Sequence, residues 1–213
     1  MSYLVKGLAG AAGCSGVCGG GYLLSQSLRG HEDHRVTAKS LIVDSGRTLL
    51  TSDSNQWTER WSEYVTATGN PLGISDYEKV SQDKQKAPES FKHACLTKVE
   101  EKVSGEDDSL FKSLSTYCIE MTAISQLITN GNTREVLSDS NDEVGWKAAW
   151  ANYINNSEGN KWGLTNWDND KKNPQSVPQD LKTKCGTKKG EKAYGVRDIK
   201  FRNVIDWCTK AKG

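Results

Sequence analysis

The sequence predicts a mainly α-helical protein, with an N-terminal transmembrane helix followed by two homologous helical units in tandem, each closed by a disulfide bond. Three observations predict this architecture: an uncharged segment at residues 7–28, a sequence pattern that occurs twice, and cysteines at matched positions of the two copies. A chain of 213 residues is long enough for one ordinary domain or two small ones. With 35% hydrophobic and 26% charged residues, it is too polar for a multi-pass membrane protein.

The N-terminal segment has the length of a membrane span. Residues 7–28 carry no charged side chain, and a helix needs about 20 apolar residues to cross a bilayer. Gly and Ala prevail over large aliphatic residues in "GLAGAAGCSGVCGGGYLLSQSL", so its hydrophobicity is marginal. We expect residues 1–30 to form an uncleaved signal-anchor and residues 31–40 a linker. Small residues at Gly7, Ala11 and Ser15 allow a second helix to approach closely, which permits a homo-oligomer through the anchor helix.

Other interpretations of this segment remain open. A cleaved secretory signal could end near residues 11–13, and a lipoprotein could carry its lipid on Cys14, although Ala11 stands where a large aliphatic residue is expected. A Gly-rich tail without fixed structure is a third alternative. We reject a dinucleotide-binding loop in "GLAGAAG", because no convincing strand precedes it and no βαβ pattern follows.

The rest of the chain repeats itself. The string "WTERWSEY" at residues 57–64 returns as "WKAAWANY" at residues 146–153. From Phe91 onward, "FKHACLTKVEEKVSGEDDSLFKSLSTYC" aligns without a gap to "LKTKCGTKKGEKAYGVRDIKFRNVIDWC", with ten identities in 28 positions where chance gives about two. We therefore predict an internal duplication, with helical repeat unit 1 at residues 41–120 and helical repeat unit 2 at residues 121–213.

The aromatic residues shared by the two copies predict the hydrophobic core. Trp, Trp and Tyr at positions i, i+4 and i+7 lie along one side of a helix, so their stripe is expected to pack inward. A stacking platform for bases or sugars is the alternative. The last helix of each unit keeps the same helical spacing between a Phe and the second cysteine. The predicted structural core therefore contains Trp57, Trp61, Tyr64, Phe111, Trp146, Trp150, Tyr153 and Phe201.

Each unit is expected to follow one order of elements. A short apolar lead-in precedes the Trp helix, a Gly/Asn loop, a helix near the first cysteine, a polar connector and a final helix. The loops "ATGNPLG" and "NNSEGNKWG" suit turns with positive φ. Pro88 and Pro178 suit the first turn of the helix that carries the first cysteine. Leu41–Val43 is the one candidate strand.

Cysteine spacing gives the clearest chemical signal. Cys95 and Cys118 are 23 residues apart, as are Cys185 and Cys208. Each pair falls on two helices expected to pack antiparallel, so we expect a disulfide in each unit, worth roughly 3 to 4 kcal/mol. Disulfides place the body outside the cell, whereas the basic residues that follow the anchor favour the opposite topology. The alternative is two pairs of reduced, buried thiols in a cytosolic protein.

The sequence offers no catalytic, cofactor-binding or metal-binding motif. Its histidines are His31, His34 and His93, too few for an evident acid-base pair or zinc site. Asp168 and Asp170 lack the Gly turn and the distal Glu of a calcium loop. A net charge of +1 gives no reason to expect a nucleic-acid partner. We therefore expect no catalytic residue, no cofactor and no metal.

Several motifs together resemble a known group of proteins. The uncharged segment ending in "GGGYLL", the W-x-x-x-W-x-x-Y element and the terminal "VIDWC" resemble the paralogous families of uncharacterised membrane-anchored proteins of haemotropic mycoplasmas. The resemblance spans the chain. It implies a wall-less cell with a single membrane, and a surface protein of an antigenically variable set. No enzymatic residue carries over, because none is established for that family. Cys14 and Cys18 depart from its usual Ala/Gly/Leu pattern, which keeps acylation open.

The expected function is an interaction or antigenic module rather than an enzyme. The chain would attach to the cell membrane through residues 7–28 as a single-pass protein, with its body extracellular and a host-surface macromolecule as its partner. One alternative is a surface enzyme with an unrecognised carboxylate site in a cleft between the units. A second is a scaffold that acts only by oligomerising.

Overall fold

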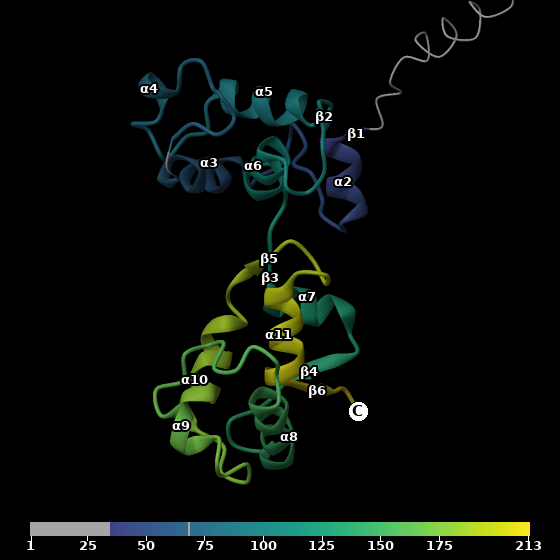
Figure 1. The fold of residues 1–213 in the computed structure, drawn as a ribbon, viewed down its shortest axis with the longest axis vertical. Helices are drawn as coiled ribbons and strands as arrows, with labels where there is room; N and C mark the ends of the chain where they lie inside the picture. Colours follow the sequence, from purple (N-terminus) through teal and green to yellow (C-terminus); the bar gives the residue numbers. More distant parts are fainter. Residues whose placement is uncertain (1–34, 68) are drawn as a thin grey trace, which may run out of the picture. The chain divides into compact units, whose positions relative to one another are not determined.

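The computed structural model describes residues 35–67 and 69–213, which are mainly helical (Figure 1). The expected anchor at residues 7–28, and with it the whole segment 1–30, lies outside the described residues. Within the described part of the chain, no helix is long and apolar enough to span a membrane.

The elements up to residue 117 belong to the first half of the body. Strand β1 pairs antiparallel with β2, placing Val36 opposite Val103, and an isolated bridge joins Leu49 to Ile119. Helix α6 contacts α2, α3 and α5 and is therefore central to this half. In chain order the elements are β1 (Val36–Thr37), α2 (Ala38–Asp44), α3 (Trp57–Thr66), α4 (Tyr77–Val80), α5 (Glu89–Lys98), β2 (Lys102–Val103) and α6 (Ser109–Tyr117).

The elements from residue 122 onward form the second half. Strand β3 pairs antiparallel with β5, and β4 with β6. Helix α11 contacts α7, α8 and α10, so it takes the central position that α6 has in the first half. In chain order the elements are β3 (Thr122–Ala123), α7 (Ile124–Gly131), β4 (Arg134–Val136), α8 (Glu143–Ile154), α9 (Trp167–Asp170), α10 (Gln179–Lys188), β5 (Lys192–Ala193), α11 (Ile199–Cys208) and β6 (Thr209–Ala211).

Each half has its own hydrophobic core. The buried residues of the first core run from Ala38 to Ile119, and those of the second run from Ile124 to Cys208. We call these the first core and the second core. The order of helices around the two cores is the same, with a helix ahead of the Trp helix, a short helix after it, the first-cysteine helix, and a central last helix.

The prediction of a strand at Leu41–Val43 is wrong, because these residues lie in α2. Thr37 caps this helix, its Oγ1 accepting a hydrogen bond from the Ser40 N–H at 3.2 Å. Ala38 and Ile42, one helical turn apart, are fully buried in the first core. Three apolar residues in a row are compatible with a helix and with a strand. The Thr37 cap and the burial of residues one helical turn apart stabilise the helix here. Residues 36–40, inside the expected linker 31–40, thus belong to β1 and α2.

Aspartates begin the last helix of each half. Asp108 accepts a hydrogen bond from the Leu110 N–H at 2.9 Å, and Asp198 accepts one from the Lys200 N–H at 2.9 Å. These carboxylates satisfy N–H groups that have no partner within the helix, which fixes where α6 and α11 begin. Residues of the expected polar connectors therefore define where both central helices begin.

Side chains link the two halves within the unit Arg35–Gly213. The guanidinium of Arg47 lies over the Tyr194 ring, 4.2 Å from its centroid. Arg197 donates to the backbone carbonyl of Asp44 at 2.8 Å. Glu59 and Lys192 form an ion pair. The two cores are thus joined by polar and cation–π contacts.

Candidate functional site

The structure contains a disulfide bond in each half, as the cysteine spacing predicted. Cys95 is bonded to Cys118 with a Cα–Cα distance of 5.4 Å, and Cys185 to Cys208 with 5.6 Å. All four cysteines are buried. Each bond ties the helix of the first cysteine, α5 or α10, to the end of the central helix, α6 or α11. Each bond therefore crosslinks two of the helices that line its core.

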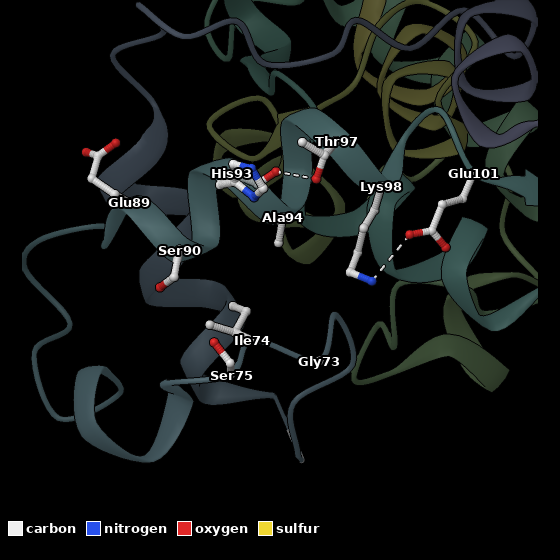
Figure 2. Close-up of a pocket in the computed structure, with 10 residues that line it drawn as sticks. All are labelled: Gly73, Ile74, Ser75, Glu89, Ser90, His93, Ala94, Thr97, Lys98 and Glu101. Carbon is white, nitrogen blue, oxygen red and sulfur yellow. Dashed lines mark hydrogen bonds and ion pairs between the residues drawn. The ribbon is translucent and has the colours of Figure 1, made fainter.

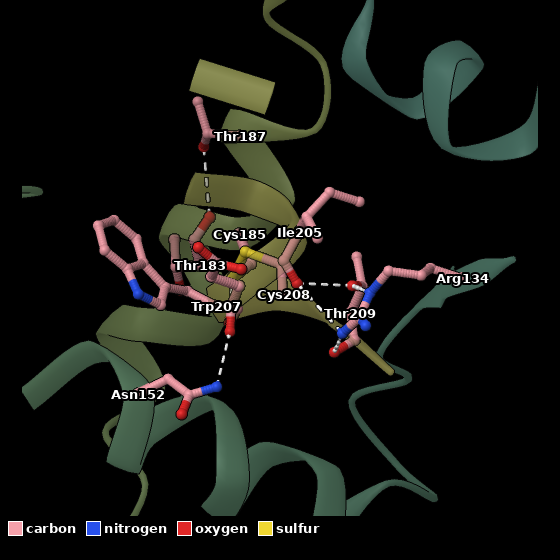
Figure 3. The surroundings of a disulfide bond; sticks show 10 residues. Arg134, Asn152, Thr183, Cys185, Thr187, Ile205, Trp207, Cys208 and Thr209 are labelled. Atoms are coloured by element: carbon pink, nitrogen blue, oxygen red, sulfur yellow. Dashed lines mark hydrogen bonds between the residues drawn. A yellow bond between two sulfur atoms is a disulfide. The ribbon is translucent and has the colours of Figure 1, made fainter. Parts of the chain in front are cut away.

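The surroundings of the second disulfide are held by backbone and side-chain contacts (Figure 3). The carbonyl oxygen of Trp207 lies 3.3 Å from Cys185 Sγ. Arg134, on β4, donates to the Thr209 Oγ1 at 2.6 Å and to its carbonyl oxygen at 3.1 Å. Strand pairing and these bonds fix the end of α11 next to the sulfur atoms.

The aromatic residues of the Trp helices lie inside the two cores. Their ring nitrogens are already bonded: Trp57 Nε1 donates to the Thr51 carbonyl at 3.0 Å, and Trp61 Nε1 to the Asp83 carbonyl at 2.7 Å. Buried rings with committed donors have no free face for stacking a ligand. Of the predicted core set, Trp57, Trp61, Tyr64, Phe111, Trp146, Trp150 and Tyr153 are at most 5% exposed, and Phe201 is partly buried against the second core.

The loop that follows each Trp helix in the sequence is held by hydrogen bonds from a tyrosine of the helix and an asparagine of the loop. The Tyr64 hydroxyl donates to Asn70 Oδ1 at 2.6 Å and accepts from the buried Leu72 N–H at 2.9 Å. Asn70 in turn accepts from the Ile74 N–H at 2.9 Å and donates to the Ile74 carbonyl at 2.7 Å. We call this arrangement the tyrosine–asparagine latch. Every polar atom of the asparagine amide acts on the loop, which is therefore fixed to α3.

The second half has the same latch. The Tyr153 hydroxyl donates to Asn160 Oδ1 at 3.1 Å and accepts from the Trp162 N–H at 2.8 Å. Asn160 accepts from the Leu164 N–H at 2.7 Å and donates to the Leu164 carbonyl at 2.9 Å. Burial raises the pKa of Tyr64 to about 12 and raises the pKa of Tyr153, so both hydroxyls keep the proton that they donate.

Glycines shape the latched loops, as their sequence predicted. Gly69 and Gly73 have φ of 82° and 61°, and Gly159 and Gly163 have 65° and 64°. Side chains rarely adopt this left-handed region, so glycine suits these turns. The asparagines act through their side chains and not through positive φ. Only the folded structure reveals that role, because the bond partners lie on a helix and in a loop.

A hollow of about 510 Å³ lies beside α5 (Figure 2). Figure 2 shows the Ser90 side chain pointing toward the segment that carries Ile74 and Ser75. The Ser90 Oγ is buried and has no hydrogen-bond partner among the described residues. At the end of α5, Lys98 forms an ion pair with Glu101 at 3.4 Å.

The second half is built differently at Asp180, which precedes Leu181 as Ser90 precedes the aligned Phe91. There Asp180 accepts from the Thr165 N–H at 2.8 Å and from the Thr165 Oγ1 at 3.2 Å. This carboxylate ties the latched loop to α10. Ser90 is too short to make the same connection to Ser75, which leaves its hydroxyl unpaired. The α5 hollow thus lacks a loop-to-helix bond that the second half possesses.

Among the described residues, the carboxylates with a shifted pKa all have a lowered pKa, caused by ion pairs with lysine or arginine or by hydrogen bonds from backbone N–H and hydroxyl groups. Hydrogen bonding to Lys171 lowers the pKa of Asp168, and hydrogen bonding to Lys210 lowers the pKa of Asp142. A general acid near neutral pH needs the opposite shift, toward a higher pKa. Over residues 35–67 and 69–213, no group of three or more His, Cys, Asp or Glu side chains is placed to hold a metal ion.

Comparison of the chain with protein-family models, with curated proteins and with solved structures found no match.

Proposed function

We propose that the chain is a single-pass membrane protein of the cell surface, attached through residues 7–28, whose body from residue 35 to residue 213 acts outside the cell as an interaction module. The observation that supports this most strongly is the pair of disulfides. Such bonds persist in oxidising environments and are rare in the cytosol. An extracellular location would therefore account for the two disulfide bonds, whereas a cytosolic location would not.

The internal symmetry supports a proposed duplication of units 41–120 and 121–213. Both halves have a disulfide between matched helices, a tyrosine–asparagine latch and an aspartate cap on the central helix. Doubling a disulfide-closed unit provides two similar cores whose loops can differ without loss of the fold. Such a body suits an interaction or antigenic role, with a host-surface macromolecule as the proposed partner and the anchor helix as a proposed contact between copies.

Protease treatment of intact cells that express the full chain with a C-terminal tag tests the topology. We expect trypsin to remove the tag from intact cells while a cytosolic marker survives, because the body would lie outside. The matched control is the same treatment after permeabilisation, which should cleave both proteins. Full protection of the body in intact cells, together with cleavage after permeabilisation, would reject the proposal.

A further inference from the structure

A second hollow, of about 510 Å³, lies in the second half between the end of α8 and the exposed side of α11. Its lining is dominated by amides, in contrast to the aromatic core next to it. We call it the asparagine hollow and define it by its polar side chains. They include Asn152, Asn155, Asn156, Arg202, Asn203 and Asp206.

One of these amides is buried without a partner. Asn203 is only 8% exposed, and none of residues 35–67 and 69–213 forms a hydrogen bond with its side chain. Its side chain lines the hollow, so its unpaired amide groups are open to a bound molecule. In the first half the matched residue is Ser113, whose hydroxyl donates to the Ser109 carbonyl at 2.8 Å. The second half thus has an unpaired amide at the wall of a hollow, where a bound molecule can pair with it.

Further polar groups of the asparagine hollow are free to bind. Arg202 and Asp206 lie one turn apart on α11, and neither side chain forms an ion pair within the described part of the chain. Asn152 uses one amide hydrogen on the Asp206 carbonyl at 3.3 Å, which leaves its second hydrogen and its oxygen available. Asn155 is exposed at the end of α8. The hollow therefore presents unpaired donors and unpaired acceptors from two rigid helices.

The charge of the hollow disfavours a charged ligand. Arg202 contributes a positive charge, and Asp206 and Glu158 contribute negative charges. Lys161 neutralises Glu158 through an ion pair at 2.5 Å. The remaining Arg202 and Asp206 charges cancel, so neither an anion nor a cation is attracted strongly.

The shape of the hollow disfavours a peptide. Peptides usually bind to a strand edge, in an apolar groove, along aromatic surfaces or on a basic cluster. The walls here are helices and a loop, and their apolar contribution is confined to Ile199 and Trp207. A molecule with many hydroxyl groups matches instead, since each hydroxyl both donates and accepts, while here the amides do both, Arg202 donates and Asp206 accepts.

We propose that the asparagine hollow binds an uncharged carbohydrate, with Asn203 as its central hydrogen-bonding residue. The inference rests on the proposed interaction function and names the chemical class of its partner. Ile199, which is 48% exposed, supplies an apolar contact at the edge of the site for the carbon face of a sugar ring. Asn203 lies on α11 next to Arg202 and lines the same hollow as Asn152 and Asn155 of the α8 end.

The test uses the purified, oxidised full chain in a detergent without sugar head groups, because a maltoside would itself compete. Maltotriose, chitotriose and lactose are titrated by calorimetry and by following the side-chain amide signals of asparagine in NMR spectra. We expect saturable binding of at least one of these probes. Asn203→Ser, which copies the first half, should weaken that binding by about tenfold or more, and Arg202→Ala should also weaken it.

The matched control is Lys112→Ala, which alters the first-half residue aligned with Arg202 and should leave the affinity within about twofold. Circular dichroism and the melting temperature show whether each variant is folded. Absence of saturable binding to all three sugars would overturn the inference, as would unchanged affinity in both the Asn203 and the Arg202 variants. Saturable binding of a peptide or of inorganic phosphate at this hollow, without binding of any of the three sugars, would also overturn it. Because the purified chain is used, the sugar result is independent of the protease test, and either proposal can fail alone.

Discussion

Removing the Tyr64 hydroxyl should destabilise the first core by disconnecting its latch. Tyr64→Phe keeps the buried ring and its contacts with Trp61 and Phe91. It removes the hydroxyl that donates to Asn70 Oδ1 and accepts from the Leu72 N–H. The substitution therefore tests hydrogen bonding with little change in packing.

The loss of stability in Tyr64→Phe can be worked out from the hydrogen-bonding groups that lose the hydroxyl as a partner. The Leu72 N–H is buried and has the Tyr64 hydroxyl as its acceptor, so its loss costs about 1–3 kcal/mol. Asn70 Oδ1 keeps the Ile74 N–H but loses the shorter bond, at a further cost of about 1 kcal/mol. We expect the free energy of unfolding to fall by about 2–4 kcal/mol.

The second half provides an internal comparison. In Tyr153→Phe the freed N–H belongs to Trp162, which is only partly buried, and the lost bond to Asn160 is longer at 3.1 Å. Water can reach that N–H more easily, so the cost should be about 1–2 kcal/mol. The control is Tyr117→Phe, since the Tyr117 ring packs against Tyr64 while its hydroxyl has no hydrogen-bond partner among the described residues.

Urea unfolding of the oxidised chain, followed by tryptophan fluorescence and circular dichroism, measures these differences. Tyr117→Phe should stay within about 0.5 kcal/mol of the unmodified protein. The reasoning is refuted if Tyr64→Phe costs no more than Tyr117→Phe, or if Tyr153→Phe costs more than Tyr64→Phe.

The remaining predictions concern the disulfides, the α5 hollow and pH. Cys185→Ala combined with Cys208→Ala should lower the stability of the second core by about 3 kcal/mol in urea, and a loss below about 1 kcal/mol would contradict the crosslinking role. Ser90→Asp should raise the melting temperature by supplying the loop-to-helix bond of Asp180, whereas Asp180→Ser should lower it; changes of the same sign would count against this. Burial raises the pKa of Tyr64 to about 12 in the folded state, above its ordinary value of about 10. The stability that depends on the protonated hydroxyl should therefore be fully present below pH 10 and fall by on the order of 2 kcal/mol as the pH rises toward 12. Tyr64→Phe should reduce this fall.

The sequence predicted the helices and disulfides because their signals are local and repeated. Helical spacing of Trp57 and Trp61 indicates a buried stripe, and the recurring cysteine interval indicates matched pairs. These features need no knowledge of distant contacts. The comparison of the two aligned segments also singled out residues that line each core, with Phe201 less buried than its counterpart Phe111.

Features that depend on tertiary contacts escaped prediction. The role of Asn70 was taken from its turn propensity, whereas the structure shows it bonded to Tyr64. Strands of two or three residues, such as Val36–Thr37, are too short for an alternating pattern to show. The unpaired amide of Asn203 could be suspected only by noticing that the aligned residue, Ser113, is smaller, and its position at a hollow emerges from the packing of α8 and α11.

The most direct test of an oxidised, extracellular body is differential alkylation of the cysteines in intact cells. The cells are lysed in denaturant that contains a first thiol reagent, which labels every free thiol and prevents disulfide exchange, and the protein is then reduced and labelled with a second reagent. We predict that Cys95, Cys118, Cys185 and Cys208 carry only the second label, and that unreduced digests contain the two crosslinked peptide pairs. If a thiol reagent present during denaturation and before reduction labels all four, the bonds are absent in the cell and the account is contradicted.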